Sequence, residues 1–114
     1  MTHKVGIVVP TLGKRPEFLR QCLESIKLAS SGRNSAFVVV VAPESFSADD
    51  YLSSGLAHKL VLDPRQGLPE AINVGMAAMP DDVQYLNWLG DDDLLTKNSL
   101  DLTAVALDEN PGVV

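Results

Sequence analysis

The chain has 114 residues, which is enough for one domain with one hydrophobic core of ordinary size. Hydrophobic residues make up 46% of it and charged residues 21%, a globular composition that excludes an intrinsically disordered or membrane-embedded protein. The formal net charge of −6 excludes an extended basic surface for nucleic acid. It also means that local groups or a metal must hold any anionic substrate against the overall field.

The N-terminal sequence MTHKVGIVVP reaches a strand pattern almost at once, without the apolar segment of a signal peptide or the roughly 20 apolar residues of a membrane span. We therefore expect a cytoplasmic protein. The single cysteine, Cys22, cannot form an internal disulfide, and its place on an apolar helix face predicts a core residue. His3 lies in a polar tail and His58 in a predicted surface turn, where we expect structural or solvated roles.

The first half of the chain alternates strand and helix patterns. Val5–Pro10 is a valine-rich apolar run, typical of a strand covered on both faces. A loop over residues 11–15 follows, and Pro16 suits the first turn of a helix. A polar connection over residues 30–35 then leads to a second apolar strand, Ala36–Ala42. The predicted helix between these strands has one apolar face: Leu19, Cys22, Leu23 and Ile26.

Shorter elements come next. Ser47, with Asp50 three residues later, resembles a capping box that begins a short helix. Lys59–Leu62 predicts a third strand, which a loop over residues 63–67 follows. Pro69 then begins a helix in which a glycine on the inward face indicates close packing. The residues predicted for that face are Ile72, Gly75, Met76 and Met79.

An apolar run over residues 83–89 predicts a buried central strand, followed by a helix over residues 96–109 and the beginning of a strand at Val113 and Val114. The alternation predicts an α/β fold of the Rossmann-like kind, with a mostly parallel sheet and helices on both faces. Ligands of such sheets bind at the carboxyl ends of the strands. Three loops should converge there: residues 11–15, 43–45 and 90–93.

The central strand ends at Gly90 and at three consecutive carboxylates, Asp91, Asp92 and Asp93. Crowded carboxylates repel one another, and Mg²⁺ or Mn²⁺ would remove that penalty with one or two of them as ligands and substrate phosphates as the rest. The triplet therefore indicates either a metal–diphosphate site or an exposed acidic turn that caps the next helix. The first loop lacks the GxGxxG and GxxxxGK[ST] patterns, which argues against dinucleotide-binding and P-loop classes.

Two segments carry a resemblance to a known family. VGIVVPTLGKRPEFLRQCLESI resembles the opening strand, the "PT" loop with its arginine, and the first helix of family 2 glycosyltransferases, which are inverting, nucleotide-sugar-dependent enzymes with the GT-A fold. GLPEAINVGMAAMPDDVQYLNWLGDDDLL resembles the block that leads to their metal motif. The resemblance covers essentially the whole chain. The residues in family register are Gly67, Ala71, Asn73, Gly75, Trp88, Leu89, Asp92 and Asp93.

The resemblance implies a donor site. Pro10, Thr11 and Arg15 match the loop that lies along the nucleoside, although Arg15 alone could equally be a solvated surface arginine. Asp92 and Asp93 match the carboxylates that hold Mn²⁺ or Mg²⁺, and Asp91 would lie beside the nucleotide. The ion would act as a Lewis acid on the leaving diphosphate of a nucleotide-diphosphate sugar. The acceptor, a saccharide or a lipid-linked molecule, is not indicated.

Three departures from the family pattern affect this site. Glu44 is the only carboxylate in the segment Ala42–Ser45 that ends the second strand, where the family has an acidic pair that reads the base. Ile72 stands where many members have an arginine, so Arg65 or Lys14 would have to balance the phosphates. The first aspartate of the metal motif aligns with Gly90, which leaves open which carboxylates of the triplet bind the metal.

The family's acceptor half and its catalytic base follow the metal motif. We therefore expect residues 1–114 to be a single truncated donor-binding domain, with the catalytic base beyond Val114. The leading hypothesis is the donor domain of an inverting glycosyltransferase. The alternative is a non-catalytic interaction or regulatory module that kept the fold and lost the donor site. A sugar-phosphate nucleotidyltransferase is a third hypothesis, which only Gly13, Lys14 and Arg15 faintly support.

Overall fold

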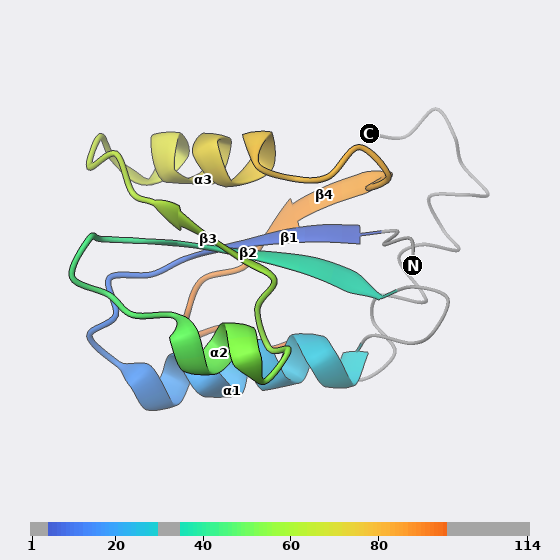
Figure 1. Cartoon of the computed structure of the whole chain (residues 1–114), viewed down its shortest axis with the longest axis horizontal. Helices are drawn as coiled ribbons and strands as arrows, with labels where there is room; N and C mark the ends of the chain where they lie inside the picture. The colour runs from blue at the N-terminus through green and yellow to red at the C-terminus, as the bar shows by residue number, and fades with distance from the viewer. Residues whose placement is uncertain (1–4, 30–34, 96–114) are drawn as a thin grey trace.

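The computed structural model describes residues 5–29 and 35–95, in which parallel strands form one sheet with helices on both faces (Figure 1). The strands are β1 (Val5–Pro10), β2 (Ala36–Ala42), β3 (Lys59–Leu62) and β4 (Tyr85–Trp88). The helices are α1 (Pro16–Ala29), α2 (Asp49–Ser53) and α3 (Leu68–Ala77). The expected α/β fold with a parallel sheet is confirmed.

Several sequence-based expectations lie outside the described residues. They are the helix over residues 96–109, the strand beginning at Val113 and Val114, and most of the polar connection over residues 30–35. The structure does not test the expectation that the catalytic base lies beyond Val114, because that expectation concerns residues outside the 114 of this sequence. That expectation stays a prediction.

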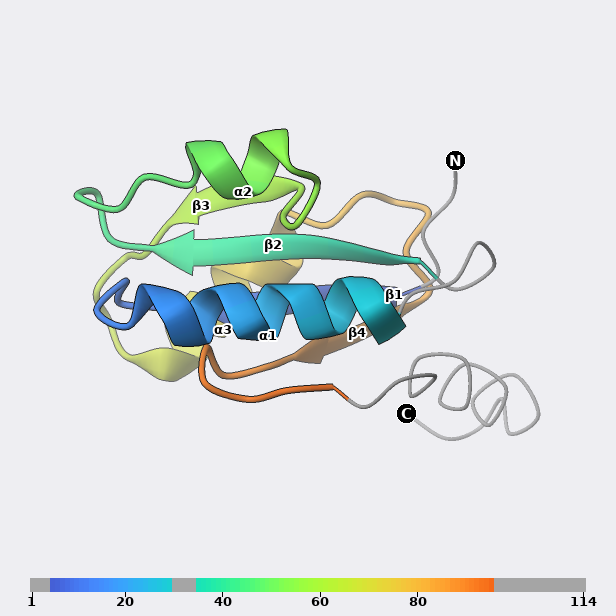
Figure 2. The same cartoon turned by 90° about the horizontal axis from the view of Figure 1, so that it is seen from below.

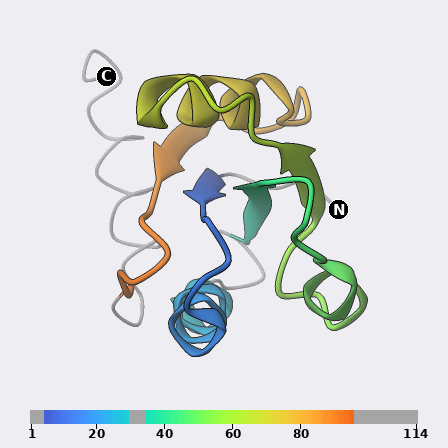
Figure 3. The same ribbon diagram turned by 90° about the vertical axis from the view of Figure 1, so that its left-hand side faces the viewer.

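Two hydrophobic layers separate the sheet from its helices. Helix α3 covers one face, and α1 with the shorter α2 covers the other (Figures 2 and 3). Successive residues of β1 alternate between the layers, so that Ile7 and Val9 pack toward α1 while Val8 packs toward α3. Because both faces are covered, the strand is apolar at every position instead of every second one. The predicted apolar face of α1 is buried as expected.

The capping box predicted at Ser47 is wrong. The N-cap of α2 is Ala48, and no side chain caps the helix. The first turn of α2 instead carries two acidic residues, Asp49 and Asp50, which suit the positive end of the helix dipole. A Ser-x-x-Asp spacing describes the cap only if the helix begins one residue earlier.

The inward face of α3 differs from the prediction by one position. Gly75 and Ala71 are its buried residues, whereas Ile72 is partly exposed and lies outside the cluster between α3 and the sheet. Gly75 is closely packed against the sheet: a Cβ atom at this position would clash with Cγ1 of Val8. Met76 and Met79, also predicted for this face, are partly buried and pack against the cluster between α3 and the sheet, so that Ile72 is the one predicted residue that does not.

Strand β4 is shorter and less central than predicted. It spans Tyr85–Trp88 instead of residues 83–89, and it lies at an edge of the sheet in the described part of the chain, where it pairs with β1 alone. Leu86 and Trp88 are about half exposed there. An apolar run predicts a strand, but it does not reveal how many neighbours the strand has.

The strand order β3-β2-β1-β4 contains a reversal. The chain builds outward from β1 to β2 and β3, and it then returns to add β4 on the other side of β1. In open α/β sheets, the carboxyl ends of the strands at such a switch point are where ligands bind. The fold therefore favours a ligand site at the loops that follow β1 and β4.

Candidate functional site

A pocket of about 750 Å³ opens at the carboxyl ends of the strands, the end that faces the viewer in Figure 3. Each of the four strands contributes to it through the loop that follows, and the start of α3 closes one side. The three loops expected to converge, over residues 11–15, 43–45 and 90–93, do so. The lining consists of Pro10, Thr11, Leu12, Lys14, Arg15, Pro43, Ser45, Asp63, Arg65, Gly67, Leu68, Ala71 and Asp91.

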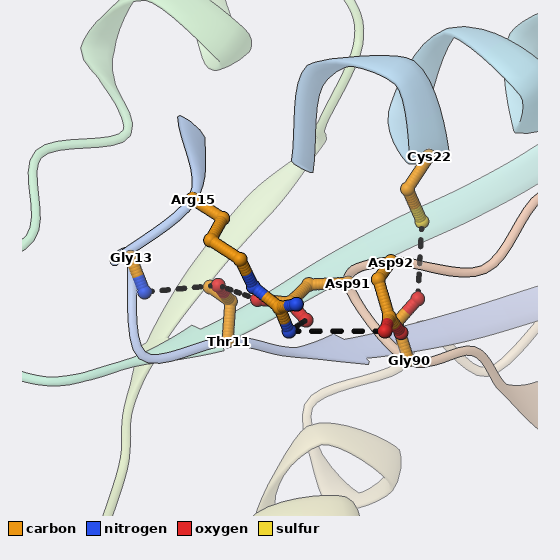
Figure 4. Close-up of polar contacts among 7 residues, drawn as sticks. All are labelled: Thr11, Gly13, Arg15, Cys22, Gly90, Asp91 and Asp92. Carbon is orange, nitrogen blue, oxygen red and sulfur yellow. Dashed lines mark hydrogen bonds and ion pairs between the residues drawn. The ribbon is translucent and has the colours of Figure 1, made fainter. Parts of the chain in front are cut away.

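A hydrogen-bonded chain links the loops after β1 and β4 (Figure 4). The Thr11 hydroxyl donates to Oδ2 of Asp91 at 2.6 Å, and it accepts the backbone N–H of Gly13 at 3.0 Å. Thr11 is the buried polar residue of the described chain. Gly13 has a positive φ of 74°, and a Cβ there would lie 2.6 Å from the Phe46 ring, so glycine is required for this loop shape. Thr11 thereby holds the Asp91 carboxylate at the switch point.

Arg15 faces the same carboxylate from the segment that leads into α1. Its Nη2 atom lies 3.9 Å from Oδ1 of Asp91 and 3.7 Å from Oδ2 of Asp92. The Arg15 side chain is 52% exposed, compared with 19% for Asp91 and 53% for Asp92. Because these groups are accessible to water, the ion pairs are weak and can rearrange when a ligand binds.

The pocket reverses the charge balance of the protein. Three of its lining side chains are cationic (Lys14, Arg15 and Arg65) and two are anionic (Asp63 and Asp91), a local excess of one positive charge in a chain of net charge −6. An anion would otherwise be repelled by the overall field. The lining therefore favours an anionic ligand at this one place.

The turn after β3 presents Arg65 in an uncommon conformation. Its φ is 60°, in the left-handed region that few residues other than glycine adopt. Oδ1 of Asp63 accepts the Arg65 backbone N–H at 2.9 Å, a side-chain bond that stabilises this kind of turn. Sequence reasoning named Arg65 but missed Asp63, although Asp63 directly follows a predicted strand, which was the signal used for the other loops.

The three aspartates of the triplet have different surroundings. Asp91 lines the pocket, whereas Asp92 and Asp93 lie outside the lining. Asp92 faces Arg15, and the Asp93 backbone N–H donates to the Gly90 carbonyl at 3.0 Å in a tight turn. Within residues 5–29 and 35–95, no three acidic, histidine or cysteine side chains gather around a possible metal position. The donor set nevertheless fits Mg²⁺ or Mn²⁺, which can bind through one or two carboxylates and complete their shell with phosphate oxygens.

Cys22 lies beneath the triplet and is fully buried. Its thiol donates to the Gly90 carbonyl at 3.5 Å (Figure 4). Burial raises the pKa of Cys22 to about 12, and the negative charges of Asp91, Asp93 and Asp92 contribute in the same direction. The thiol therefore stays protonated at neutral pH and remains a hydrogen-bond donor, as a core residue would.

Of the remaining residues that the sequence singled out, one lines the pocket and others do not. Pro10 lines it, and Glu44 is exposed and outside the lining. Nδ1 of His58 accepts the backbone N–H of Val38 at 3.0 Å, and its ring stacks on Phe37, which is a structural role. No helix in the described ranges is both long and apolar enough to cross a membrane.

The chain shares its fold with solved glycosyltransferases. TarS from S. aureus, residues 1–349, matches with a TM-score of 0.74 and 19% identity over 93% of this chain and 32% of the TarS chain. The same TarS region in complex with UDP-GlcNAc gives a TM-score of 0.70 and 19% identity, over 93% and 31%. The mannosyltransferase PcManGT from Pyrobaculum calidifontis, in complex with GDP-Man and Mn²⁺, gives 0.66 and 23% identity, over 94% and 32%.

These likenesses confirm a GT-A-like glycosyltransferase fold. The chain spans about one third of the length of these three solved chains. No protein-family profile and no curated protein sequence matches it.

Proposed function

We propose that this chain is the donor-binding part of a glycosyltransferase and holds a nucleotide-diphosphate sugar in the pocket at the carboxyl ends of the strands, for inverting transfer to an acceptor hydroxyl. The observation that carries the proposal is the pocket itself: it lies at the switch point of the sheet, and its lining is cationic in an acidic protein. Solved proteins of the same fold are in complex with UDP, UDP-GlcNAc or GDP-Man, which supports this ligand class.

The diphosphate would lie between Arg15 and Asp91. Arg15 is half exposed and can turn from the aspartates to a phosphate oxygen, while Lys14 and Arg65 supply further positive charge from the neighbouring loops. These cations replace the family arginine whose position Ile72 occupies. Thr11 keeps Asp91 oriented during the exchange through their 2.6 Å hydrogen bond.

A divalent cation would be held by Asp91, with Asp92 and Asp93 as the further carboxylates of the motif. Bound Mn²⁺ or Mg²⁺ supplies a Lewis acid that neutralises the charge developing on the leaving nucleoside diphosphate. The burial of Asp91 in the pocket wall makes it the first candidate of the three. The PcManGT complex contains Mn²⁺, which supports a metal requirement in this fold.

The base of the nucleotide would lie toward β2 and β3. Asp63 is the carboxylate that lines the pocket at that side, and one of its oxygens already accepts the Arg65 N–H, which fixes its orientation. Glu44, which the sequence suggested, lies outside the lining. We therefore assign base recognition to Asp63.

The group that deprotonates the acceptor is a separate part of the proposal. An inverting transfer needs a positioned base for the proton of the attacking hydroxyl. We assign no such base within the pocket, and we keep the expectation that it lies beyond Val114. The acceptor stays open between a saccharide and a lipid-linked molecule.

Isothermal titration calorimetry tests the proposal. UDP, GDP, UDP-GlcNAc and GDP-Man are titrated into the chain with Mn²⁺, with Mn²⁺ plus EDTA, and with the Asp91→Asn variant. We expect binding with Mn²⁺, its loss with EDTA, and a weakening of about 10- to 100-fold in the variant, because a hydrogen bond to a charged group contributes about 1.5 to 3 kcal/mol.

Matched variants test the base assignment. Asp63→Asn should weaken nucleotide binding, and Glu44→Gln, which changes an exposed carboxylate outside the pocket, should not. Equal binding with Mn²⁺, with EDTA and in Asp91→Asn would contradict the metal-dependent site. A wild-type chain that binds none of the four ligands would contradict the donor role and favour a non-catalytic module.

A further inference from the structure

The loop that carries the acidic triplet is held by hydrogen bonds to helix α1. The last ladder-type hydrogen bond of this region joins the Leu89 N–H to the Val8 carbonyl at 2.9 Å. Beyond it, the loop over residues 90–95 is held at its two ends by α1. The Cys22 thiol donates to the Gly90 carbonyl at 3.5 Å, and the Leu95 N–H donates to Oγ of Ser25 at 3.0 Å.

The Ser25 hydroxyl is both a hydrogen-bond donor and a hydrogen-bond acceptor. Oγ accepts the Leu95 N–H, and its O–H donates to the Cys22 carbonyl within α1 at 2.6 Å. A hydroxyl has one proton to donate, so the bond to Cys22 fixes which lone pairs face Leu95. The side chain is partly buried, and water competes less for these bonds than it would at an exposed serine. The helix thus fixes the position of the loop end.

The same helix also delivers the cation that faces the triplet. Arg15 immediately precedes α1, and its carbonyl accepts the backbone N–H of Leu19 at 3.1 Å, which ties it to the first turn. Cys22 and Ser25 follow within the next turns. Helix α1 therefore fixes the positions of both residues of the Arg15–Asp91 ion pair. Arg15 lies in the segment that leads into the helix, and Asp91 lies in the loop that the helix holds.

We propose that Ser25 is a positioning residue of the donor site: its hydroxyl, together with the Cys22 thiol, fixes the loop over residues 90–95 on α1 so that Asp91 meets Thr11 and Arg15 at the pocket wall. This inference rests on the proposed function. Carboxylates that bind a metal and a diphosphate must be held close to one geometry. Residues that hold the loop of these carboxylates in place therefore contribute to the affinity for the ligand without contacting it.

Two variants of Ser25 and one matched control test the proposal. Ser25→Ala removes the acceptor of the Leu95 N–H, and Ser25→Thr keeps the hydroxyl. Ser53→Ala is the control, because the Ser53 hydroxyl makes the same kind of bond to a carbonyl three residues earlier, at 3.3 Å from Asp50, without touching a distant loop. Any effect of losing a hydroxyl within a helix appears in both alanine variants.

The first measurement needs no ligand. Amide hydrogen exchange of residues 90–95 should be about 2- to 10-fold faster in Ser25→Ala, the factor that corresponds to one hydrogen bond, and unchanged in Ser25→Thr and Ser53→Ala. The second is the dissociation constant for UDP with Mn²⁺, which should rise by about the same factor in Ser25→Ala alone. The free energy of unfolding of Ser25→Ala in urea should fall by no more than one hydrogen bond contributes, about 0.5 to 1.5 kcal/mol, so that a general loss of stability does not explain the result.

The outcomes separate the two proposals. Unchanged loop exchange in Ser25→Ala overturns the anchoring role while the proposed function stands. Faster exchange with unchanged nucleotide affinity overturns the positioning role. If the wild-type chain binds no nucleotide, the proposed function fails, and the exchange measurement by itself decides whether Ser25 holds the loop. Faster exchange, weaker binding and rescue by Ser25→Thr together support the inference.

Discussion

Replacing Arg15 should change the affinities for metal and for nucleotide in opposite directions. Its guanidinium lies within 4 Å of two carboxylates of the triplet, at 3.9 Å from Asp91 and 3.7 Å from Asp92. Each contact is worth about 1 kcal/mol by Coulomb's law in water, and exposure at this site reduces the net contribution to about 0 to 1 kcal/mol. A metal ion that binds these carboxylates must displace Arg15. In Arg15→Gln, Mn²⁺ alone should therefore bind up to about 5-fold more tightly.

Nucleotide binding should respond in the opposite way. With Mn²⁺ present, the diphosphate loses a charge-assisted hydrogen bond from Arg15, which corresponds to a weakening of about 10- to 100-fold. The opposite signs are the specific expectation, because a variant that merely damages the fold weakens both. Free Mn²⁺ is measured by electron paramagnetic resonance, and UDP binding by calorimetry.

Lys14→Gln is the matched control for this experiment. Lys14 lines the same pocket, and in the described part of the chain it makes no ion pair with the triplet. Its replacement should weaken UDP binding and leave the affinity for Mn²⁺ alone unchanged. The reasoning is refuted if Arg15→Gln leaves Mn²⁺ binding unchanged, or if both affinities fall together.

Further predictions concern stability and the site. Gly75→Ala should lower the free energy of unfolding, measured in urea, by about 1 to 3 kcal/mol, because the new methyl group clashes with the sheet. Asn73→Ala, on the exposed side of α3, should not lower it. A Gly75→Ala variant as stable as the wild type would contradict the close packing of α3 on the sheet. Thr11→Val should weaken Mn²⁺-dependent UDP binding about 10-fold, because Asp91 loses its 2.6 Å hydrogen bond, and Thr11→Ser should bind UDP as the wild type does. Unchanged UDP binding in Thr11→Val would contradict a role for this bond. The pKa of Cys22, raised from 9.0 to about 12, means that the unfolded chain loses this proton first. The contribution of Cys22 to stability is thus fully present below pH 9 and falls by up to about 1.4 kcal/mol per pH unit above it, a slope that urea titrations should find smaller in Cys22→Ala.

The regular elements could be predicted well because their causes are local. β1, β2 and β3 have the bounds that the apolar runs indicated, and α1 begins at Pro16 with the expected face inward. Valine-rich runs flanked by polar or glycine-containing loops have few alternatives in a chain of this composition. The loops at the strand ends followed from the same pattern, and the resemblance to family 2 glycosyltransferases then placed Thr11, Arg15 and Asp91 among the predicted site residues.

The errors arose where neighbours distant in the sequence decide the outcome. Ile72 was assigned to the sheet face by its helical spacing, but Ala71 and Gly75 are the buried residues of α3, and Gly75 lies so close to Val8 that a Cβ atom has no room there. Glu44 was expected on the base side because it follows β2, but it lies outside the pocket lining, which includes Asp63 after β3; which carboxylate reads the base stays a prediction. Neither result is encoded in local periodicity, since both depend on the distance between packed elements.

The sequence by itself determined which chemical groups stand at the ends of the strands: a threonine and an arginine after the first, and three aspartates after the last. Only the tertiary structure decided that Asp91, and not its two neighbours, faces the pocket. The reason is geometric. Successive side chains of a tight turn point in different directions, and the strand order places β4 beside β1, so that Thr11 and Asp91 meet at 2.6 Å although 80 positions separate them.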